Sequence, residues 1–388
     1  MARLYDLLRL NFAIYPGVID YRAADFLHPL YEARKRRQGP IRLAVNVLVA
    51  GFWWFWVPVR APNIARRWNK DRRWVAEATR LAREWFYDPN DLAMWSIVEN
   101  GGLRTHQRRF EQSAVIRAME SAETDHSAEM IDKIRFQQRC EALELPIPRH
   151  AATLRDGAVE WHDRSIRHCL GKPVRGSGGY GIEVFEASRL RDGDVPESLR
   201  QGEILVQERL RPHAELRPIT FGVLATARIV TLLDEALSPE IVWAGLRFAG
   251  RPEAIVDNGH QGGFGALIDI SSGEMGMGMV IHDPPEFARH PVSGAPILGR
   301  IPPDWPETRE LVLKAHRQLA PRQVIVGWDI GLSDHGPVLI EANQRPAVRM
   351  TQRLSGKGIG ATRYGELVEF HLRRTADRME NRRLLTAG

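Results

Sequence analysis

Residues 324–343, with the sequence VIVGWDIGLSDHGPVLIEAN, constrain the fold of this chain more than any other stretch. Two apolar runs flank a short polar segment, a pattern that predicts a β-hairpin with a tight turn. If residues 334–336 form a three-residue loop, the register places Asp329 opposite Glu341. Directly opposed side chains lie about 5 Å apart on one face, and Asn343, two residues beyond Glu341, shares that face.

This register predicts a metal site. Unpaired carboxylates between apolar strands are costly, whereas carboxylate and amide oxygens suit a hard divalent cation. Asp329, Glu341 and Asn343 are therefore the candidate metal ligands. The residues alone also allow a solvent-exposed hairpin face with scattered acids.

The chain has 388 residues, of which 44% are hydrophobic, so it can bury a large core and form two or more lobes. Cys140 and Cys169 are its two cysteines and lack zinc-type spacing, which favours a reducing compartment. The N-terminus has no cleavable signal pattern, and we expect a cytoplasmic protein.

Positive charge is concentrated in one segment. Residues 34–73 contain eleven Lys or Arg and one Asp, a net charge of +10, whereas the whole chain has a net charge of +6. Such local basicity argues against a nucleic-acid-binding protein and for one basic contact surface.

An uncharged segment with three tryptophans, residues 43–59, lies inside this basic region. Its length is at the lower limit for a membrane span, and Asn46, Gly51 and Pro58 weaken a regular helix. Three alternatives stay open: a buried element of the soluble core, a segment at the membrane surface, and a true span. The basic flanks single out docking on an anionic surface, at the inner face of the cytoplasmic membrane, as the alternative to test.

Helical patterns dominate the first third of the chain. An apolar stripe at helical spacing covers residues 74–86, Asp88 has the position of a helix cap, and another helix is expected over residues 106–121. We therefore expect a mostly helical region over residues 1–125 and an α+β region over residues 126–388.

Further elements are expected in the second region. A D-x-x-E capping box at Asp304 opens one of its helices. The expected helices cover residues 127–143, 304–319 and 364–383, and the expected strands outside the hairpins cover residues 204–207 and 227–232.

A glycine-rich stretch lies within residues 170–186. Gly176, Gly178 and Gly181 match the dinucleotide fingerprint G-x-G-x-x-G, but that fingerprint requires a following helix, and the chain here alternates like a strand. We therefore expect a strand, a loop and a strand. The amide groups of this loop would close over phosphates, with Lys172 supplying positive charge. A plain surface hairpin is the alternative.

Taken in order, these features resemble the ATP-grasp enzymes: a lysine at a helix start, Lys-Pro before a glycine hairpin, a strand ending in Gln-Glu, an arginine strand and an Asp/Glu/Asn hairpin. The resemblance runs over residues 132–349. DNGHQGGFGALIDISSGE, HPVSGAPILG and the final hairpin resemble the sugar-transfer associated branch of that superfamily. The implied fold is α+β, with two α+β subdomains gripping ATP, after a mostly helical N-terminal region.

The resemblance also implies the site. Asp329, Glu341 and Asn343 would bind Mg²⁺, and Lys172 and Arg228 would stabilise the transferring phosphoryl group. Arg228 would replace an arginine that many ATP-grasp ligases carry at the position of Gly327. Adenine would lie on the backbone of residues 207–210, and ribose at Glu215. The residues expected to bind ATP are Lys133, Lys172, Gly176, Ser177, Gly178, Gly179, Gln207, Glu208, Leu210 and Glu215.

The implied activity is that of a carboxylate–amine ligase, in which ATP phosphorylates a carboxylate and an amine displaces phosphate from the acyl phosphate. Its partners would be a small or glycan-linked carboxylate and an amine acceptor, in cell-surface polysaccharide assembly. Two alternatives stay open: an ATP-dependent kinase of a sugar or polyol, and a membrane-associated scaffold with a vestigial ATP site.

Overall fold

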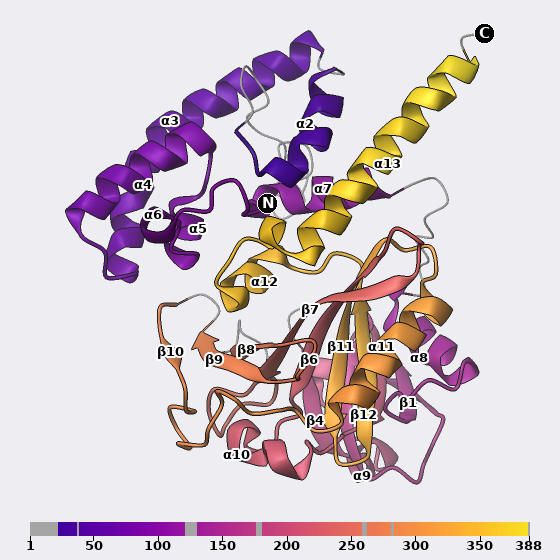
Figure 1. Cartoon of the computed structure of the whole chain (residues 1–388). Coiled ribbons are helices and arrows are strands. Elements are labelled where there is room, and N and C mark those ends of the chain that lie inside the picture. Colours follow the sequence, from indigo (N-terminus) through magenta and orange to yellow (C-terminus); the bar gives the residue numbers. More distant parts are fainter. Residues whose placement is uncertain are drawn as a thin grey trace.

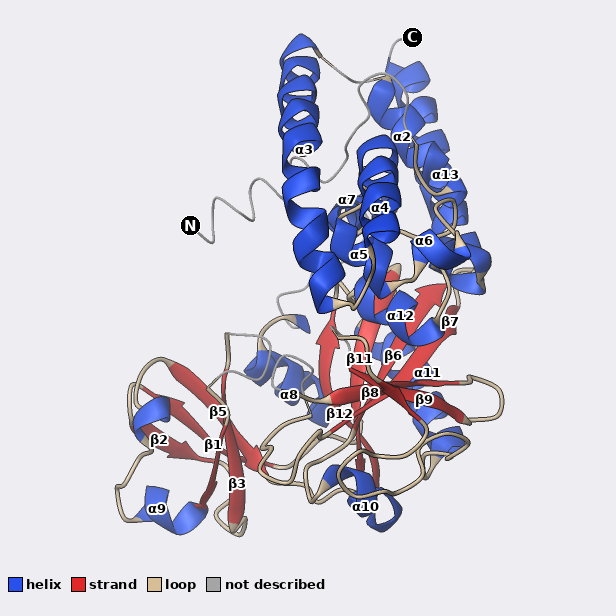
Figure 2. Cartoon of the chain, turned by 90° about the vertical axis from the view of Figure 1, so that its left-hand side faces the viewer, coloured by secondary structure: helices blue, strands red, loops and turns tan. Residues whose placement is uncertain are grey.

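The computed structural model describes residues 22–36, 39–120, 130–175, 181–257, 262–280 and 283–386. A helical region stands on a body that contains a five-stranded and a seven-stranded sheet (Figures 1 and 2). The chain forms the helices first, then the smaller sheet, then the larger sheet. Its last helix returns to pack against the N-terminal helices (Figure 1). The α+β class predicted from the sequence is confirmed.

The N-terminal helices largely follow the sequence pattern. The stripe over residues 74–86 packs between two neighbouring helices, and the predicted cap is confirmed because Asp88 accepts a hydrogen bond from the Asn90 amide. The helix expected over residues 106–121 is shorter. The elements are η1 (Asp25–Leu27), α2 (His28–Lys35), α3 (Pro40–Arg67), α4 (Arg72–Trp85), α5 (Pro89–Met94), α6 (Ile97–Asn100), η2 (Arg109–Glu111) and α7 (Gln112–Met119).

Helix α3 contains the uncharged segment and runs through Pro58 and Pro62 without a break. The expectation that Asn46, Gly51 and Pro58 weaken a regular helix is therefore wrong. Packing of its C-terminal half against α4 and α5 offsets the hydrogen bonds that proline removes. Within the described part of the chain, α3 alone has the length and apolarity of a membrane span, and 17% of its most apolar window is buried.

The smaller sheet has the strand order β2-β1-β5-β3-β4 and antiparallel pairing throughout its described strands. Pairing of β3 with β4 confirms the two strands predicted on either side of the glycine-rich loop, whose residues 176–180 lie outside the described residues. Helix α8 begins at Lys133, later than predicted. The elements are α8 (Lys133–Ala142), β1 (His150–Arg155), β2 (Ala158–Trp161), β3 (His168–Pro173), β4 (Glu183–Glu186), α9 (Ala187–Arg191), η4 (Glu197–Leu199) and β5 (Glu203–Glu208).

The larger sheet has the order β10-β9-β8-β7-β6-β11-β12. Helix α11 packs on one face, and α12 and α13 pack on the other. The elements are η5 (Ala214–Leu216), α10 (Arg217–Thr220), β6 (Thr226–Leu233), β7 (Pro239–Phe248), β8 (Phe264–Ile268), β9 (Met275–Val280), β10 (Glu286–Phe287), α11 (Trp305–Leu319), β11 (Ile325–Ser333), β12 (Gly336–Asn343), α12 (Val348–Ser355), η7 (Ile359–Ala361) and α13 (Arg363–Thr386).

The capping box predicted at the start of α11 is wrong. Asp304 precedes the helix, but it has φ 52° and ψ 36°, and its side chain makes no capping hydrogen bond. A side-chain cap requires an extended backbone at that position, which directs the side-chain oxygen towards the free amides of the first turn.

β11 and β12 form the predicted hairpin with a turn one residue shorter than expected. Ser333 pairs with Gly336, which leaves a two-residue turn. A β-bulge then places the additional residue Ile340 on β12, and Asp329 faces Glu341 as predicted. The pairing at the candidate site is therefore confirmed, although the predicted loop is wrong.

The N-terminal helices are fixed to the body through α12, which follows the hairpin. Arg349 of α12 lies 3.0 Å from the buried carboxylate of Asp91 in α5. The side-chain amide of Gln352 accepts a hydrogen bond from Gln107 N at 2.7 Å and donates one to Gln107 O at 3.0 Å. One hydrophobic cluster also joins α2, α7, α13 and the larger sheet. The domain boundary after residue 125 stays a prediction.

Candidate functional site

Asp329 lies in the middle of the larger sheet, where its strand pairs with both neighbours. It faces Arg228 on β6 and Glu341 on β12, and it is 2% exposed. Arg228 donates two hydrogen bonds to the Asp329 carboxylate, from Nε and from Nη2, the latter at 2.8 Å. Burial would raise the pKa of Asp329, but Arg228 and Arg247 together hold it well below its usual range.

Arg247 is a site residue that the sequence analysis did not identify. Its Nη2 lies 3.3 Å from Asp329 Oδ2, and its Nε lies 3.9 Å from the carboxylate of Asp257. Burial raises the pKa of Asp257, against the effect of this arginine. A single arginine in the apolar run of β7 was the signal in the sequence, because a buried charge requires a partner.

Glu341 and Asn343 complete the predicted set of ligands. The two side chains lie side by side, with Asn343 Nδ2 donating to Glu341 Oε1 at 3.3 Å. Burial and the neighbouring Asp329 raise the pKa of Glu341. Two adjacent carboxylates in a buried site favour a cation between them, because the cation removes their repulsion.

Lys172 approaches these acids from the smaller sheet. It lies on β3 and is 6% exposed. Burial lowers the pKa of Lys172 to about 8; Glu341 and Asp329 oppose this shift, and Lys133 adds to it. Lys133, the first residue of α8, donates from Nζ to Val174 O at 3.3 Å, and burial lowers its pKa. Lys172 of β3, Lys133 of α8 and the acids of the larger sheet thus share one electrostatic environment.

The residues predicted to hold adenine lie where the chain passes from the smaller to the larger sheet. Gln207 lies in β5, and the nitrogen of its buried side chain donates a hydrogen bond to Gln137 of α8. Glu208 N donates to Arg149 O at 2.9 Å. The carboxylate of Glu208 lies 3.3 Å from Arg149 Nε. The side-chain nitrogen of Gln207 thus already has a hydrogen-bond partner within the protein.

The rest of this connection runs beside the hairpin. Leu210 is half-buried, and Pro212 forms a β-bridge with Ser333 of β11. His213 N donates to Leu332 O at 3.0 Å, and Glu215, in η5, is exposed. The connection therefore joins the smaller sheet to the strand that carries Asp329.

The positions of four predicted ATP-binding residues are not described. Gly176, Ser177, Gly178 and Gly179 lie outside the described residues. Their predicted contact with phosphates stays a prediction.

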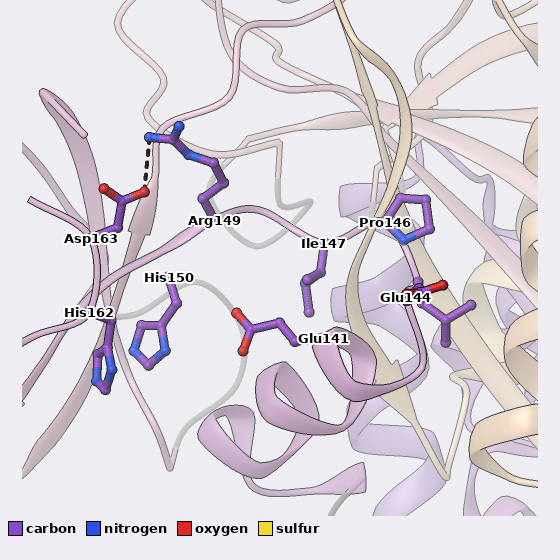
Figure 3. A pocket seen from close by; sticks show the side chains of 9 residues that line it. Glu141, Glu144, Pro146, Ile147, Arg149, His150, His162 and Asp163 are labelled. Atoms are coloured by element: carbon purple, nitrogen blue, oxygen red, sulfur yellow. Dashed lines mark ion pairs between the residues drawn. The ribbon is translucent and has the colours of Figure 1, made fainter. Parts of the chain in front are cut away.

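A pocket of about 590 Å³ opens at the junction of α8 and β1 (Figure 3). His150 and His162 stack there with ring centroids 3.9 Å apart, and Arg149 forms an ion pair with Asp163 at 3.3 Å. The lining residues are Glu141, Glu144, Leu145, Pro146, Ile147, Arg149, His150, His162 and Asp163. They include none of the predicted site residues, although Arg149 also contacts Glu208 and His150 pairs with Gln207.

The donor set fits Mg²⁺ shared with a polyphosphate. Asp329 Oδ1 accepts from Arg228 Nε and keeps a second lone pair, whereas Oδ2 lies against both Arg228 and Arg247. Glu341 and Asn343 add oxygens of the kind that Mg²⁺ prefers. The described residues contain no group of three or more His, Cys, Asp or Glu side chains that could hold a metal alone. Mg²⁺ is commonly bound by one or two carboxylates together with substrate phosphates, which matches this set.

Residues 120–363 match the sugar-transfer associated ATP-grasp family. The match covers more than half of the 388 residues, and the chain belongs to this family. The family resemblance and the ATP-grasp fold expected from the sequence are thereby confirmed. Every residue predicted for the site lies inside the matched span.

Solved structures similar to this chain include several ligases. The D-alanine–D-alanine ligase from Bacillus anthracis has 12% identity and a TM-score of 0.36, over 66% of this chain and 69% of that chain. The VanG D-Ala:D-Ser ligase from Enterococcus faecalis has 12% identity and a TM-score of 0.38, over 64% and 62%. The ATP-grasp ligase PsnB, complexed with precursor peptide PsnA2 and AMPPNP, has 16% identity and a TM-score of 0.36, over 63% and 58%. No curated protein sequence matches this chain.

Proposed function

We propose that this protein is an ATP- and Mg²⁺-dependent carboxylate–amine ligase that acts through an acyl phosphate. One observation carries the proposal: buried Lys172 of the smaller sheet shares a site with Asp329 and Glu341 of the larger sheet. Cations from one part of the fold and acids from another are what binding of a metal-bound polyphosphate requires. Membership of the ATP-grasp family supports the same conclusion.

The residues predicted for phosphate and metal binding have proposed roles. Lys133 and Lys172 bind phosphate oxygens, and Lys172 also offsets charge on the transferring phosphoryl group. Glu341, Asn343 and Asp329 would hold Mg²⁺, which would neutralise charge on the phosphates. Arg228 keeps Asp329 ionised and fixes its orientation, and its proposed role in the reaction is to stabilise charge on the phosphoryl group.

The proposed reaction has two steps. An oxygen of the substrate carboxylate attacks the γ-phosphorus, and the bond from that phosphorus to the ADP oxygen breaks. The amine nitrogen then attacks the acyl carbon, phosphate leaves with the electron pair of the carbon–oxygen bond, and the amine loses a proton. The products are an amide, ADP and phosphate. Exclusion of water from the acyl phosphate is the proposed task of the glycine-rich loop, residues 176–181.

The proposed substrates rest on the description of the family more than on the geometry of the site. The description of the family as associated with sugar transfer supports a carboxylate or amine acceptor that belongs to a cell-surface polysaccharide or its precursor. For the nucleotide, the backbone of residues 207–210 would hold adenine and Glu215 would face the ribose, close to the connection between the sheets.

Trapping of the acyl phosphate tests this function. Purified protein is incubated with ATP, Mg²⁺, hydroxylamine and pools of sugar acids or amino acids, and the hydroxamate is detected together with ADP and free phosphate. A hydroxamate that depends on one carboxylate supports the ligase. A phosphorylated alcohol formed without free phosphate identifies a sugar or polyol kinase instead. Absence of nucleotide binding in thermal melting would indicate a scaffold with a vestigial site.

A further inference from the structure

Helix α3 exposes a continuous apolar stripe. The residues of this stripe are largely exposed: Ile41 82%, Leu48 72%, Phe52 63%, Phe55 76% and Val59 69%. At about 100° of rotation per residue these five positions fall within an arc of about 60°. A stripe of large apolar side chains in water is unfavourable, and it commonly marks a contact surface.

The stripe is not the face that holds the fold together. Trp53, Val57, Ala61 and Ile64 form the buried face of α3 and lie on the opposite side of the helix by the same rotation. Trp53 Nε1 donates to Ala82 O of α4 at 2.9 Å. One face of α3 is therefore used by the helical region, and the other has no such partner among the described residues.

Positive charge lies at both ends of the stripe. Arg66, seven residues after Val59, continues the exposed line along the helix surface. Arg67 beside it is exposed but forms an ion pair with Asp283 at 2.8 Å. Residues 34–36, at the end of α2, are two arginines and a lysine, and all three are exposed. The stripe belongs to the segment of residues 34–73, whose net charge is +10.

We propose that this face of α3 docks the protein on an anionic lipid bilayer, with the helix lying along the membrane surface. The apolar side chains would enter the boundary between headgroups and acyl chains, and the flanking cations would pair with acidic lipids. A span across the bilayer would expose the packed face of α3 to lipid and remove Trp53 and Val57 from α4 and α5. Three cations of the segment pair with acids outside it, as Arg60–Asp88, Arg67–Asp283 and Lys70–Glu99. Charge complementarity still selects the anionic bilayer over a second copy, because the segment stays strongly positive and two copies of it repel each other.

The proposal does not depend on the ligase reaction. No residue of the stripe belongs to the candidate ATP site, so membrane binding and turnover can be measured and can fail separately. Trp53 is unsuitable as a probe because it is 7% exposed and bonded to α4. Phe52 and Phe55 are suitable because most of each side chain is already in water.

Vesicle co-sedimentation of the full chain tests the proposal. The protein should bind phosphatidylcholine vesicles that contain phosphatidylglycerol, bind pure phosphatidylcholine poorly, and lose binding as salt screens the cations. The double variant Phe52→Ser, Phe55→Ser should lower the partition coefficient more than about tenfold. Arg66→Gln should lower it about fivefold. The control Val292→Ser, Leu298→Ser changes exposed apolar residues outside α3 and should bind like the wild type.

Three results would overturn the proposal. The first is wild-type protein that stays in the supernatant with anionic vesicles at low salt. The second is a dimer in solution that the phenylalanine variant converts to a monomer, since a second copy would then cover the stripe. The third is protein that resists alkaline extraction from cell membranes, which indicates a span. If the phenylalanine variant melts early, Ile41→Ser, Leu48→Ser tests the same stripe farther from the packed half of α3.

Discussion

Arg247 of β7 and Asp329 of β11 lie 3.3 Å apart across the intervening strand β6, whose Arg228 binds the same carboxylate. Two guanidinium groups on one buried carboxylate keep it ionised and fix its orientation. The acid predicted to bind metal is therefore held by arginines from neighbouring strands. That Arg228 replaces the arginine expected at the position of Gly327 stays a prediction, and its contact with Asp329 is consistent with it.

Arg247→Ala should destabilise the protein strongly. The substitution leaves Asp257 without its arginine and removes one of the two partners of Asp329, and breaking a buried ion pair costs about 3–5 kcal/mol. Urea denaturation measures the loss, with Arg317→Ala on the surface of α11 as the control. Adding Asp257→Asn to Arg247→Ala should recover part of the stability. Equal stability of Arg247→Ala and the wild type would show that the arginine is not needed there.

Glu341→Gln should abolish metal-dependent turnover and leave the fold intact. The free energy of unfolding should stay equal or rise, because burial and Asp329 already disfavour the ionised form of Glu341. Turnover should fall by at least about 100-fold, since the amide binds Mg²⁺ weakly. ATP hydrolysis against Mg²⁺ concentration checks this, with exposed Glu310→Gln as the control. For the wild type, Mg²⁺ affinity should weaken as falling pH protonates Glu341. Normal steady-state activity in Glu341→Gln would exclude the hairpin from the mechanism.

The sequence correctly predicted that Asp329 pairs with Glu341, but the predicted hairpin register contained two errors that cancel. The turn is one residue shorter than assumed, and a bulge at Ile340 adds one residue to β12. A bulge is a response to neighbouring strands and packing, so local sequence does not specify it. The acids and their shared face were predictable because side-chain direction alternates along a strand.

Other features depended on contacts between distant segments. Arg247 became a site residue only when β7 was placed beside β6. The apolar segment in α3 was ambiguous because hydropathy does not tell which face of a helix is packed. Asp304 has the residue type of a cap but a left-handed backbone, which the D-x-x-E pattern does not specify.

Lys172→Met should stabilise the metal-free protein while weakening ATP binding. Burial lowers the pKa of Lys172 to about 8, so near neutral pH the folded state bears an ammonium whose burial costs on the order of a few kcal/mol. The unfolded chain keeps this proton up to about pH 10.4. The free energy of unfolding of the wild type should therefore rise with pH between about 8 and 10 relative to Lys172→Met.

Thermal melting in EDTA measures this difference, with Lys314→Met on α11 as the control. ATP should also bind with net proton uptake near pH 8.5 in the wild type, because phosphate favours the ammonium. Calorimetry in buffers of different ionisation enthalpy detects that uptake. Identical proton uptake in Lys172→Met would assign it to another group.

Gly327→Ala should disturb the hairpin at Asn343, which pairs with Gly327. A Cβ at position 327 would lie 2.8 Å from Pro346 Cβ and 3.6 Å from Asn343 O, closer to the proline than real side chains pack. A longer side chain such as arginine at position 327 would meet the same proline, and the replacement of its charge by Arg228 stays a prediction. Such overpacking costs about 1–3 kcal/mol, and turnover should fall because Asn343 moves with Pro346.

A double-mutant cycle with Pro346→Gly identifies the cause. If the contact with proline is responsible, Gly327→Ala should cost much less in the Pro346→Gly background than in the wild type, in both urea stability and ATP turnover. Gly276→Ala in β9 is the matched control, since its added Cβ would meet Leu267 Cβ at an ordinary 3.7 Å. If Gly327→Ala lowers stability and turnover equally in the two backgrounds, contact with Pro346 is not the reason that position 327 requires glycine.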